Sequence, residues 1–385
     1  MDNKLKILLF SPYLPSRDTV GCARKIYDFI RLSSQRGHSV YLLSFCSEED
    51  KKRVASISPY CGKIYLEYLK DYRSYPDKSL YFQEIIGDFS RNRTIDILQC
   101  ENSYLRRYFP AGIGVPSVLV EHEVLSVSFW EKAGFEENPI KKLILYARAV
   151  KKSFEERSWY RQFDRIIVFS DADKNTISLR HKTKNIDVIA LGINSEEYAL
   201  SQESEKLYDL IFVGNFSHSP NVDAVFYFCK EILPLIKKNL PNISFLIAGA
   251  NPPLLIKNLA KFDKNIMVTG YVENLKDSYA KSKVFVAHIR YGTGMRFKIL
   301  EALASRAAVV TTSIGARGLN FKGIIKIADG KRECADAVIE LLGASDKRQE
   351  LAISGRQAVE KYYDWSKLLD KYEDIYYNLL HSCPN

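Results

Sequence analysis

The sequence lacks several patterns that mark large classes of protein. It contains no run of about 20 apolar residues, so no transmembrane helix is expected. Its seven cysteines are scattered without a CxxC pair, which fits reduced thiols and argues against a zinc site or a disulfide framework. The start of the chain shows no signal-peptide pattern. These absences predict a cytoplasmic protein without a bound metal.

Sequence signatures of nucleic-acid-binding proteins are missing as well. There is no zinc-finger or RRM signature and no persuasive helix-turn-helix. Nucleic acid therefore ranks last among the partners that explain a net charge of +10, behind an anionic membrane surface and a phosphorylated ligand. The first strand-like segment is not followed by GxGxxG, which argues against a dinucleotide oxidoreductase.

Apolar segments that read as strands alternate with amphipathic helical segments, and this series occurs twice. A chain of 385 residues is too long for one typical core, which also predicts two domains. Two alternating series predict an α/β fold with two doubly wound parallel sheets, each covered by helices on both faces. The predicted strands are Lys6–Tyr13, Ser39–Cys46, Ile64–Leu69, Ile95–Cys100, Ser117–Glu121, Arg165–Ser170 and Asp187–Leu191, then Leu210–Val213, Ile243–Ala248, Ile266–Thr269, Lys283–Ala287, Ala308–Thr312 and Gly323–Ala328.

The predicted domain boundaries follow from composition. Residues 1–194 are predicted to form the first Rossmann-like domain, and the polar, Glu- and Ser-rich residues 195–207 a linker. Residues 208–362 form the second Rossmann-like domain, which is expected to bind the phosphorylated ligand. Residues 363–385 carry apolar side chains at helical spacing, and we expect this helix to cross back to the first domain.

The segment from Tyr291 to Leu303 predicts an anion-binding loop. Gly292 and Gly294 follow a strand, and a helix begins directly after them. Glycines let the backbone approach a ligand, and a helix N-terminus attracts phosphate. Arg296 and Lys298 add positive charge, and the Glu301 carboxylate can accept hydrogen bonds from ribose hydroxyls. The ligand-binding residues predicted here are Gly292, Thr293, Gly294, Met295, Arg296, Lys298 and Glu301, for a nucleoside diphosphate. A tight loop before a surface helix is the alternative.

Two further strand–loop–helix junctions contain a glycine that is placed to approach a ligand. Gly21 precedes the first helix, and Gly214 follows the first strand of the second series. Asn221 is expected to be the N-cap of the helix after Gly214.

His122 follows a buried strand between two carboxylates, Glu121 and Glu123. A side chain at the carboxyl end of such a strand points into a ligand-binding crevice. His122 is predicted either to position a sugar hydroxyl or to accept a proton, and a satisfied structural histidine is the alternative. Because neighbours on a strand alternate between faces, at most one of the two carboxylates is expected beside His122.

A helix predicted over Pro139–Arg161 carries seven basic residues and an apolar series at helical spacing, Ile140, Leu143, Ile144, Ala147, Val150 and Phe154. The first interpretation is a core-packed helix with a solvated basic face. The second is docking on an anionic membrane surface.

These segments together resemble the GT-B fold glycosyltransferases, specifically the large retaining group called family 4. The resemblance covers nearly the whole chain and is strongest from about Leu210 to Leu319. The matching segments are Gly37-His38-Ser39-Val40, Leu191-Gly192-Ile193-Asn194, Val213-Gly214, Pro220-Asn221-Val222-Asp223, Arg296-Phe297-Lys298-Ile299-Leu300-Glu301-Ala302, Val309-Val310-Thr311-Thr312 and Gly315-Ala316-Arg317-Gly318-Leu319. The resemblance implies two domains that face each other across a cleft, with residues 1–194 on the acceptor side.

The resemblance also implies roles for individual residues. Glu301 is similar to the second glutamate of the group's E-x7-E motif, which binds the nucleotide ribose, whereas Thr293 stands in the place of the first. Arg296 and Lys298 would neutralise the diphosphate, and His122 would lie beside the donor sugar. The catalytic residues are thus expected to be His122, Arg296 and Lys298.

A mechanism follows from the charge that develops during transfer. Negative charge grows on the β-phosphate as the glycosidic bond breaks, and no DxD metal motif is evident. Backbone N–H groups at Gly294–Arg296 and the two cations are therefore expected to stabilise it. No residue stands out as a covalent nucleophile. The resemblance implies attack from the same face with retention, in which the leaving phosphate oxygen takes the acceptor's proton.

The sequence thus predicts a retaining, metal-independent, hexosyltransferase-like enzyme of polysaccharide or glycoconjugate biosynthesis. It is expected to need no cofactor beyond a UDP- or GDP-linked sugar donor. The acceptor is expected to be a glycan or a lipid-linked glycan, at the inner face of the membrane, with peripheral association with anionic lipid. The alternatives are a non-catalytic sugar-nucleotide-binding or partner-binding module, suggested by Thr293, and a GT-B-related nucleotide-sugar epimerase or phosphorylase.

Overall fold

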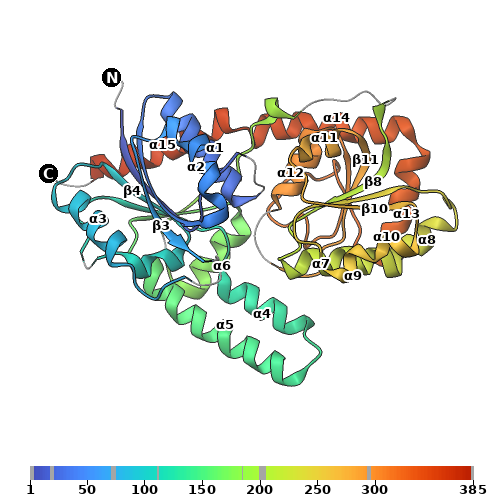
Figure 1. Ribbon diagram of the computed structural model, residues 1–385, viewed down its shortest axis with the longest axis horizontal. Coiled ribbons are helices and arrows are strands. Elements are labelled where there is room, and N and C mark those ends of the chain that lie inside the picture. The colour runs from blue at the N-terminus through green and yellow to red at the C-terminus, as the bar shows by residue number, and fades with distance from the viewer. Residues whose placement is uncertain are drawn as a thin grey trace. The chain divides into compact units, whose positions relative to one another are not determined.

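The chain forms two structural units, each built on one parallel sheet flanked by helices (Figure 1). The computed structural model describes residues 4–17, 21–70, 75–110, 112–183, 185–198, 205–292 and 296–382. The first unit comprises Met1–Gly192 together with Trp365–Asn385, and the second comprises Ile193–Asp364. The C-terminal helix therefore belongs to the first unit.

The sheet of the first unit has seven parallel strands in the order β3-β2-β1-β4-β5-β6-β7. Its central strands are buried along their whole length, which explains why their sequences are almost continuously apolar. The strands are β1 (Lys6–Ser11), β2 (Ser39–Ser47), β3 (Lys63–Leu69), β4 (Ile97–Glu101), β5 (Ser117–Val120), β6 (Arg165–Val168) and β7 (Ile186–Val188).

The helices of the first unit lie between these strands in the sequence, apart from the last one. They are α1 (Cys22–Gln35), α2 (Val54–Ile57), α3 (Leu80–Arg91), α4 (Leu125–Phe135), α5 (Pro139–Tyr160), α6 (Asp171–His181) and α15 (Trp365–Ser382). Helices α4 and α5 form a hairpin that projects from the rest of the unit (Figure 1).

The sheet of the second unit repeats this topology with six parallel strands in the order β10-β9-β8-β11-β12-β13. The strands are β8 (Tyr208–Val213), β9 (Phe245–Ala248), β10 (Ile266–Gly270), β11 (Ser282–Ala287), β12 (Ala308–Thr311) and β13 (Lys326–Ile327). The helices are α7 (Ser219–Tyr227), α8 (Leu233–Lys237), α9 (Leu254–Lys257), α10 (Leu259–Phe262), α11 (Leu275–Ala280), α12 (Phe297–Ala304), α13 (Lys331–Gly343) and α14 (Ser345–Tyr362).

The predicted α/β fold with two doubly wound sheets is confirmed, and every predicted strand is present. Two of the edge strands, β7 and β13, are shorter than expected. β13 has two residues, because only Lys326 and Ile327 pair with β12. The helical stretch that follows Gly214, residues 219–237, is interrupted by a π-helical turn over Phe228–Ile232. Pro234 lacks the N–H that an α-helix would direct to the carbonyl of Lys230, which explains the irregular turn.

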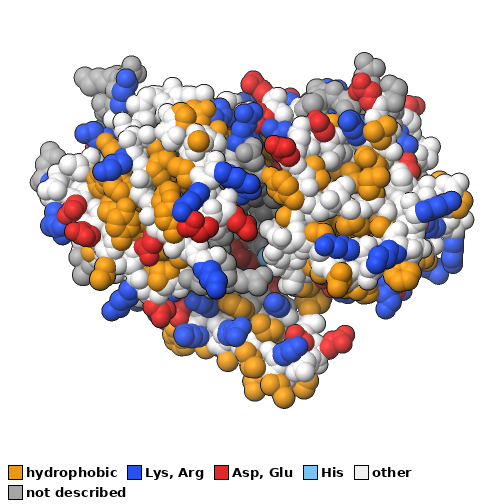
Figure 2. Space-filling model, in the orientation of Figure 1, with side chains coloured by type: hydrophobic (Ala, Val, Ile, Leu, Met, Phe, Trp, Pro, Cys, Tyr) orange, Lys and Arg blue, Asp and Glu red, His pale blue; other side chains and the backbone are white. Residues whose placement is uncertain are grey.

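The apolar series recognised in α5 lies at the surface. Ile140, Leu143 and Phe154 are 71%, 70% and 71% exposed, and Ile144 and Val150 are about half exposed. Figure 2 shows hydrophobic and basic side chains next to one another over the hairpin of α4 and α5. The expectation that this apolar series packs into the core is therefore wrong. Helix α5 instead buries the opposite side, with Leu145, Ala149, Glu156 and Tyr160.

Helix α15 packs on α1 through aromatic side chains. Trp365, Tyr372 and Tyr376 are almost completely buried, and the rings of Phe29 and Tyr372 lie 5.1 Å apart. Arg36, which follows α1, pairs with Glu373 at 2.9 Å. The apolar spacing recognised in the sequence is thus the face that α15 buries.

Gly192 is required where the chain leaves the first unit. A Cβ atom at this position would lie 2.4 Å from Cδ2 and Cε2 of Trp365, whose side chain is 1% exposed. No flexible group can give way, because the indole is held inside the core.

We predict that Gly192→Ala lowers the free energy of unfolding of the first unit by about 1–3 kcal/mol, because the indole must shift in a packed core. Urea denaturation followed by tryptophan fluorescence measures this change. Gly134→Ala in α4 is the control, since no atom lies within 4 Å of its added Cβ. An equal loss in both variants would contradict the steric explanation.

Candidate active site

The strand order of the first sheet reverses between β1 and β4, which lie side by side. In doubly wound sheets, the crevice at the carboxyl ends of the two strands at such a reversal is the usual ligand site. Glu101 is the last residue of β4, Lys25 lies in the first turn of α1, and His122 follows β5. The sheet therefore brings three charged or titratable side chains to one edge.

Lys25, Glu101 and His122 form a buried network. The Nζ atom of Lys25 lies 3.1 and 3.0 Å from the two carboxylate oxygens of Glu101, and both side chains are fully buried. Nε2 of His122 lies 2.5 Å from Oε2 of Glu101. The amide of Gln99 donates to Oε1 of Glu101 at 2.6 Å and is in turn bonded by the hydroxyl of Tyr376 in α15.

The network fixes the charge of its members. Burial alone would raise the pKa of Glu101, but Lys25 and His122 lower it to about 2. Burial would likewise lower the pKa of His122, yet the neighbouring Cys22 and Glu101 raise it to about 9. At neutral pH the ring of His122 is therefore protonated on both nitrogens.

The second ring nitrogen of His122, Nδ1, is buried and has no hydrogen-bond partner in the described part of the chain. Since a protonated ring donates hydrogen bonds and accepts none, the geometry favours positioning an oxygen of a ligand over acting as a base. Of the two flanking carboxylates, Glu121 is buried, and burial raises its pKa to about 8. The carboxylate that pairs with His122 is that of Glu101, in the neighbouring strand β4.

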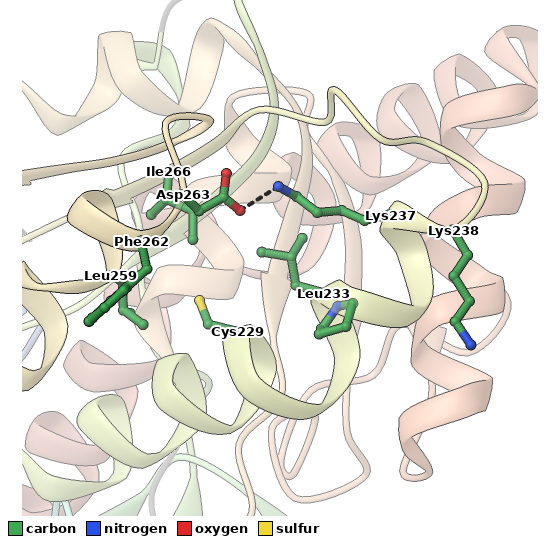
Figure 3. A pocket seen from close by; sticks show the side chains of 9 residues that line it. Cys229, Leu233, Lys237, Lys238, Leu259, Phe262, Asp263 and Ile266 are labelled. Carbon is green, nitrogen blue, oxygen red and sulfur yellow. Dashed lines mark hydrogen bonds and ion pairs between the residues drawn. The ribbon is translucent and has the colours of Figure 1, made fainter.

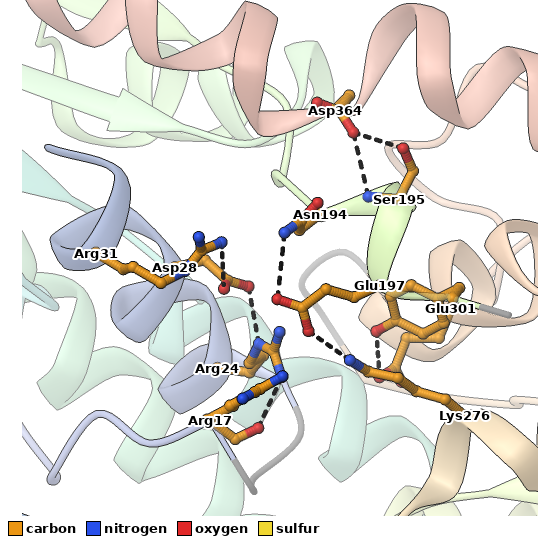
Figure 4. Close-up of polar contacts among 11 residues, drawn as sticks. Arg17, Arg24, Asp28, Arg31, Asn194, Ser195, Glu197, Lys276, Glu301 and Asp364 are labelled. Atoms are coloured by element: carbon orange, nitrogen blue, oxygen red, sulfur yellow. Dashed lines mark hydrogen bonds and ion pairs between the residues drawn. The ribbon is translucent and has the colours of Figure 1, made fainter. Parts of the chain in front are cut away.

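Gly21 is the N-cap of α1, with a φ of 71° that favours glycine. It is half-buried, and no atom lies within 4 Å of the place where its Cβ would be. The first turn of α1 contains no acidic residue, so the positive end of the helix is not neutralised there. Arg24 pairs with Asp28 and donates to the carbonyl of Arg17, which fastens the loop after β1 to the helix (Figure 4).

The second sheet has the same reversal between β8 and β11. The loop after β8 contains Gly214, and the loop after β11 contains Gly292 and leads into α12. The predicted binding residues that the structure describes in this unit therefore gather at one edge of its sheet. Thr293, Gly294 and Met295 lie outside the described residues.

Lys298 is the half-buried cation of this second group. Its Nζ donates to Oδ1 of Asn221 at 2.6 Å and lies 4.5 Å from the ring centre of Phe212. Burial and the neighbouring Arg296 lower the pKa of Lys298 to about 7. The prediction that Asn221 is a helix N-cap is wrong: α7 begins at Ser219, and the Asn221 side chain bridges Lys298 and the carbonyl of Asn215.

The space around Lys298 depends on two glycines. A Cβ on Gly214 would lie 3.0 Å from Nζ of Lys298 and 2.9 Å from the amide of Asn221. A Cβ on Gly249, which follows β9, would lie 1.9 Å from the carbonyl oxygen of Gly214. Glycine at both positions lets the loops after β8 and β9 lie against each other.

Arg296 is the N-cap of α12, and its guanidinium donates to the carbonyl of Gly292 at 2.8 Å. Gly292 has a φ of 110°, and a Cβ there would meet the same guanidinium at 3.0 Å. The cation is thus held against the loop that the sequence identified.

A second ion pair at this edge was not predicted. Arg290 forms a two-point contact with the carboxylate of Asp223 in α7 and lies 4.2 Å above the ring of Tyr227. That ring stacks on His288 with an interplanar angle of 12°. These contacts tie the start of the loop after β11 to α7.

Glu301 is 5% exposed and accepts hydrogen bonds from the hydroxyls of Tyr198 at 3.0 Å and Tyr279 at 3.2 Å. Tyr198 ends a short segment that the structure fixes on the second unit, where Ser195 bonds Asp364 and Glu197 pairs with Lys276 (Figure 4). The first part of the predicted linker therefore contributes a partner of Glu301.

A separate apolar pocket lies between α8 and α10 of the second unit (Figure 3). Leu233, Leu259 and Phe262 line it, and Lys237 pairs with Asp263 beside them. Ile266, another lining residue, is the first residue of β10. The pocket thus lies at the amino end of that strand, away from the edge where parallel sheets bind ligands.

Sequence reasoning missed the partners of the predicted residues: Lys25, Gln99, Glu101, Asn221 as a Lys298 ligand, Arg290, Asp223, Tyr198 and Tyr279. Of these residues, only Glu101 has a recognisable position in the sequence, at the end of a predicted strand. The same kind of position led to the prediction for His122. The others lie within helices or loops, where no spacing rule relates them to the site.

The comparison with protein families identifies the second unit. Residues 208–344 match the model of the family described as glycosyl transferases group 1. This range contains Gly214, Arg296, Lys298 and Glu301. The second unit therefore carries a domain that matches this family, the chain has the two-sheet GT-B fold, and the protein is a glycosyltransferase.

Similar proteins span nearly the whole chain. The "Uncharacterized 44.6 kDa protein in cps region" of Klebsiella pneumoniae is 22% identical over 387 residues, 94% of this chain and 97% of that protein. Sucrose-phosphate synthase from Thermosynechococcus elongatus has a TM-score of 0.77 at 14% identity and covers 99% of this chain and 100% of that one. A TarM variant of S. aureus was solved in complex with Fondaparinux, alpha-GlcNAc-glycerol and UDP. Its TM-score is 0.75 at 12% identity, and the match covers 98% of this chain and 100% of that one.

We predict that Lys25→Met destabilises the first unit by about 3 kcal/mol, because it leaves the buried Glu101 without its main counter-charge. Urea denaturation of the single variants and of Lys25→Met with Glu101→Gln measures the coupling. The double variant is expected to lose less than the sum of the single losses. Additive losses would show that the two charges do not depend on each other.

Proposed function

We propose that this glycosyltransferase is a retaining enzyme that works without a metal ion and moves a sugar from a nucleoside-diphosphate sugar to a glycan or lipid-linked acceptor. The observation that carries the proposal is the pair of cations at the edge of the second sheet. Lys298 is half-buried with a neutral hydrogen-bond partner, and Arg296 stands at the start of α12. An anion that binds there meets two cations and a helix N-terminus.

The two cations suit the leaving group of the reaction. As the bond between sugar and phosphate breaks, charge develops on the β-phosphate oxygen, and fixed positive groups in a buried site stabilise it strongly. A lysine whose pKa lies near 7 gains its charge most readily when an anion binds. Lys298 and Arg296 would together supply the stabilisation that a divalent metal supplies elsewhere.

For the donor we propose a UDP- or GDP-linked sugar, with Glu301 accepting hydrogen bonds from the ribose. UDP in the TarM complex supports the first choice. His122 would donate a hydrogen bond from Nδ1 to an oxygen of the donor sugar, as the family resemblance implies. In this reaction the acceptor hydroxyl attacks from the face that the leaving phosphate occupies, and the phosphate oxygen takes its proton.

For the acceptor we propose a glycan or lipid-linked glycan of polysaccharide biosynthesis, at the inner face of the membrane. The cps-region relative and the alpha-GlcNAc-glycerol in the TarM complex support this class. No helix among the described residues is long and apolar enough to cross a membrane.

We predict that a nucleoside diphosphate, UDP or GDP, binds in the presence of EDTA and that Lys298→Met weakens this binding at least tenfold. A charge-assisted hydrogen bond to phosphate contributes about 1.5–3 kcal/mol, which corresponds to that loss. Isothermal titration calorimetry measures the dissociation constants. Binding that needs magnesium, or no binding of any nucleotide, would overturn the proposal.

We further predict that nucleotide binding takes up a proton at pH 8. Lys298 is largely neutral above its folded-state pKa of about 7, and a bound diphosphate raises that pKa, so the side chain becomes charged. Calorimetric titrations in buffers of different ionisation enthalpy give the number of protons taken up on binding. Lys298→Arg is the matched control, because arginine stays charged and takes up none. Equal uptake in both proteins would assign the proton to another group.

We predict that the product keeps the anomeric configuration of the donor. The coupling constant of the anomeric proton, measured by NMR on the product, gives this configuration. An inverted anomer would contradict same-face attack while leaving the nucleotide-binding prediction intact.

A further inference from the structure

A cysteine stands at the edge of the first sheet where Lys25, Glu101 and His122 meet. Cys22 is the first residue of α1, and its side chain has no role in the proposed transfer. It is half-buried, whereas three other cysteines of the described chain are buried, Cys46, Cys100 and Cys334. A partly exposed thiol beside a charged network is a candidate for chemistry of its own.

The place of Cys22 on its helix favours a negative charge. The first turn of α1 has backbone N–H groups without helical partners and lies at the positive end of the helix dipole. It contains no acidic side chain that would neutralise this end. Beside it, no atom lies within 4 Å of the place where a Cβ on Gly21 would be, so the start of the helix is open.

The neighbouring network has more positive than negative charge. Lys25 and the protonated ring of His122 are two cations, and Glu101 is the one carboxylate that pairs with both. Glu101 takes Nε2 of His122, while Nδ1 is buried and has no hydrogen-bond partner among the described residues. Cys22 lies close enough to raise the pKa of His122. A thiolate at Cys22 would therefore balance the second cation.

The surroundings of Cys22 act on its thiol as this balance requires. Burial alone would raise the pKa of the thiol, but His122, the hydroxyl of Tyr13 and Lys25 together hold it below its ordinary value. Tyr13 and Tyr104 bring no competing negative charge, because burial raises the pKa of both hydroxyls well above the usual range. Tyr13 therefore acts as a neutral hydrogen-bond donor.

Two cysteines of similar exposure lack these neighbours. Cys61 and Cys229 are also half-buried, but burial raises the pKa of each thiol to about 12. Neither thiol is ionised near neutral pH, so both serve as internal references for Cys22.

We propose that Cys22 is a thiolate that hydroperoxides oxidise to a sulfenic acid. The sulfur attacks one peroxide oxygen, an S–O bond forms and the O–O bond breaks. The sulfur loses two electrons to the peroxide, and the leaving hydroxide takes a proton from solvent and becomes water. A dithiol reverses the change, since it is oxidised to a disulfide while the added oxygen leaves as water.

Hydrogen peroxide suits this place because it is small and because His122 and Tyr13 can donate hydrogen bonds to the oxygen that leaves. The modification adds an oxygen beside His122, where it would compete with the donor sugar for Nδ1. This consequence rests on the proposed function, whereas the reactivity of Cys22 does not.

Trapping of sulfenic acid with dimedone tests the proposal in the full-length protein at neutral pH, without a sugar donor. After treatment with hydrogen peroxide, peptide mass spectrometry is expected to find Cys22 labelled about tenfold faster than Cys61 and Cys229. Dithiothreitol added before dimedone should prevent the label. Equal rates at the three cysteines, or no label on Cys22, would overturn the proposal.

Two variants test the cause of the reactivity. His122→Gln removes a cation and is expected to slow alkylation of Cys22 by iodoacetamide about tenfold at neutral pH, and Tyr13→Phe about threefold. In the unchanged protein this rate should reach half its maximum at a lower pH than that of free cysteine, because the thiolate is protonated only below its lowered pKa. Both variants should move that midpoint to higher pH.

The matched control is Tyr65→Phe in β3, which removes the hydroxyl of another half-buried tyrosine of the first unit and should leave the rate unchanged. Sedimentation and circular dichroism show that each variant is folded. A midpoint equal to that of free cysteine, or an unchanged rate in both test variants, would contradict the proposal. Neither measurement needs a nucleotide, so a failure of nucleotide binding would count against the proposed function alone.

Discussion

The reversal of strand order at the middle of each sheet is the constraint on which both groups of candidate residues depend. Right-handed crossovers carry the chain from β1 and from β4 to opposite faces, so the loops after these strands separate and leave a crevice. Lys25 follows one of these strands and Glu101 ends the other. In the second unit, β8 and β11 place Gly214 and the loop to α12 in the same relation.

The two groups treat buried charge in opposite ways. In the first, the carboxylate of Glu101 lies between two cations, Lys25 and the protonated ring of His122, so each charge has an opposite charge within hydrogen-bond distance. In the second, Lys298 has a neutral amide as its hydrogen-bond partner and a second cation, Arg296, beside it, and burial together with Arg296 lowers its pKa. An anion that binds beside Lys298 would favour its charged form. This contrast supports the proposal that the phosphates bind to the second unit.

The fold and the main loops could be predicted because their signals are local. Buried parallel strands are continuous apolar segments, and glycines mark the loops that follow them. The partners of the site residues could not be predicted from the sequence. Lys25 and Glu101, for example, are 76 positions apart and are brought together only by the sheet. The error at Pro139–Arg161 has a different cause. Periodicity showed that one face of α5 is apolar, but the helix has two such faces, and Leu145 and Ala149, not Leu143, are buried.

The surroundings of Glu301 bear on the ribose-binding role that the resemblance implies for it. Thr293 stands where the resemblance places the first glutamate of the motif, and Glu301 stands at the second. Its two oxygens each accept one tyrosine hydroxyl, from Tyr198 and Tyr279. Both hydroxyls hold the carboxylate from within the second unit and so orient it. Because Tyr198 belongs to the segment with which the chain enters the second unit, the orientation of Glu301 depends on how that segment is packed.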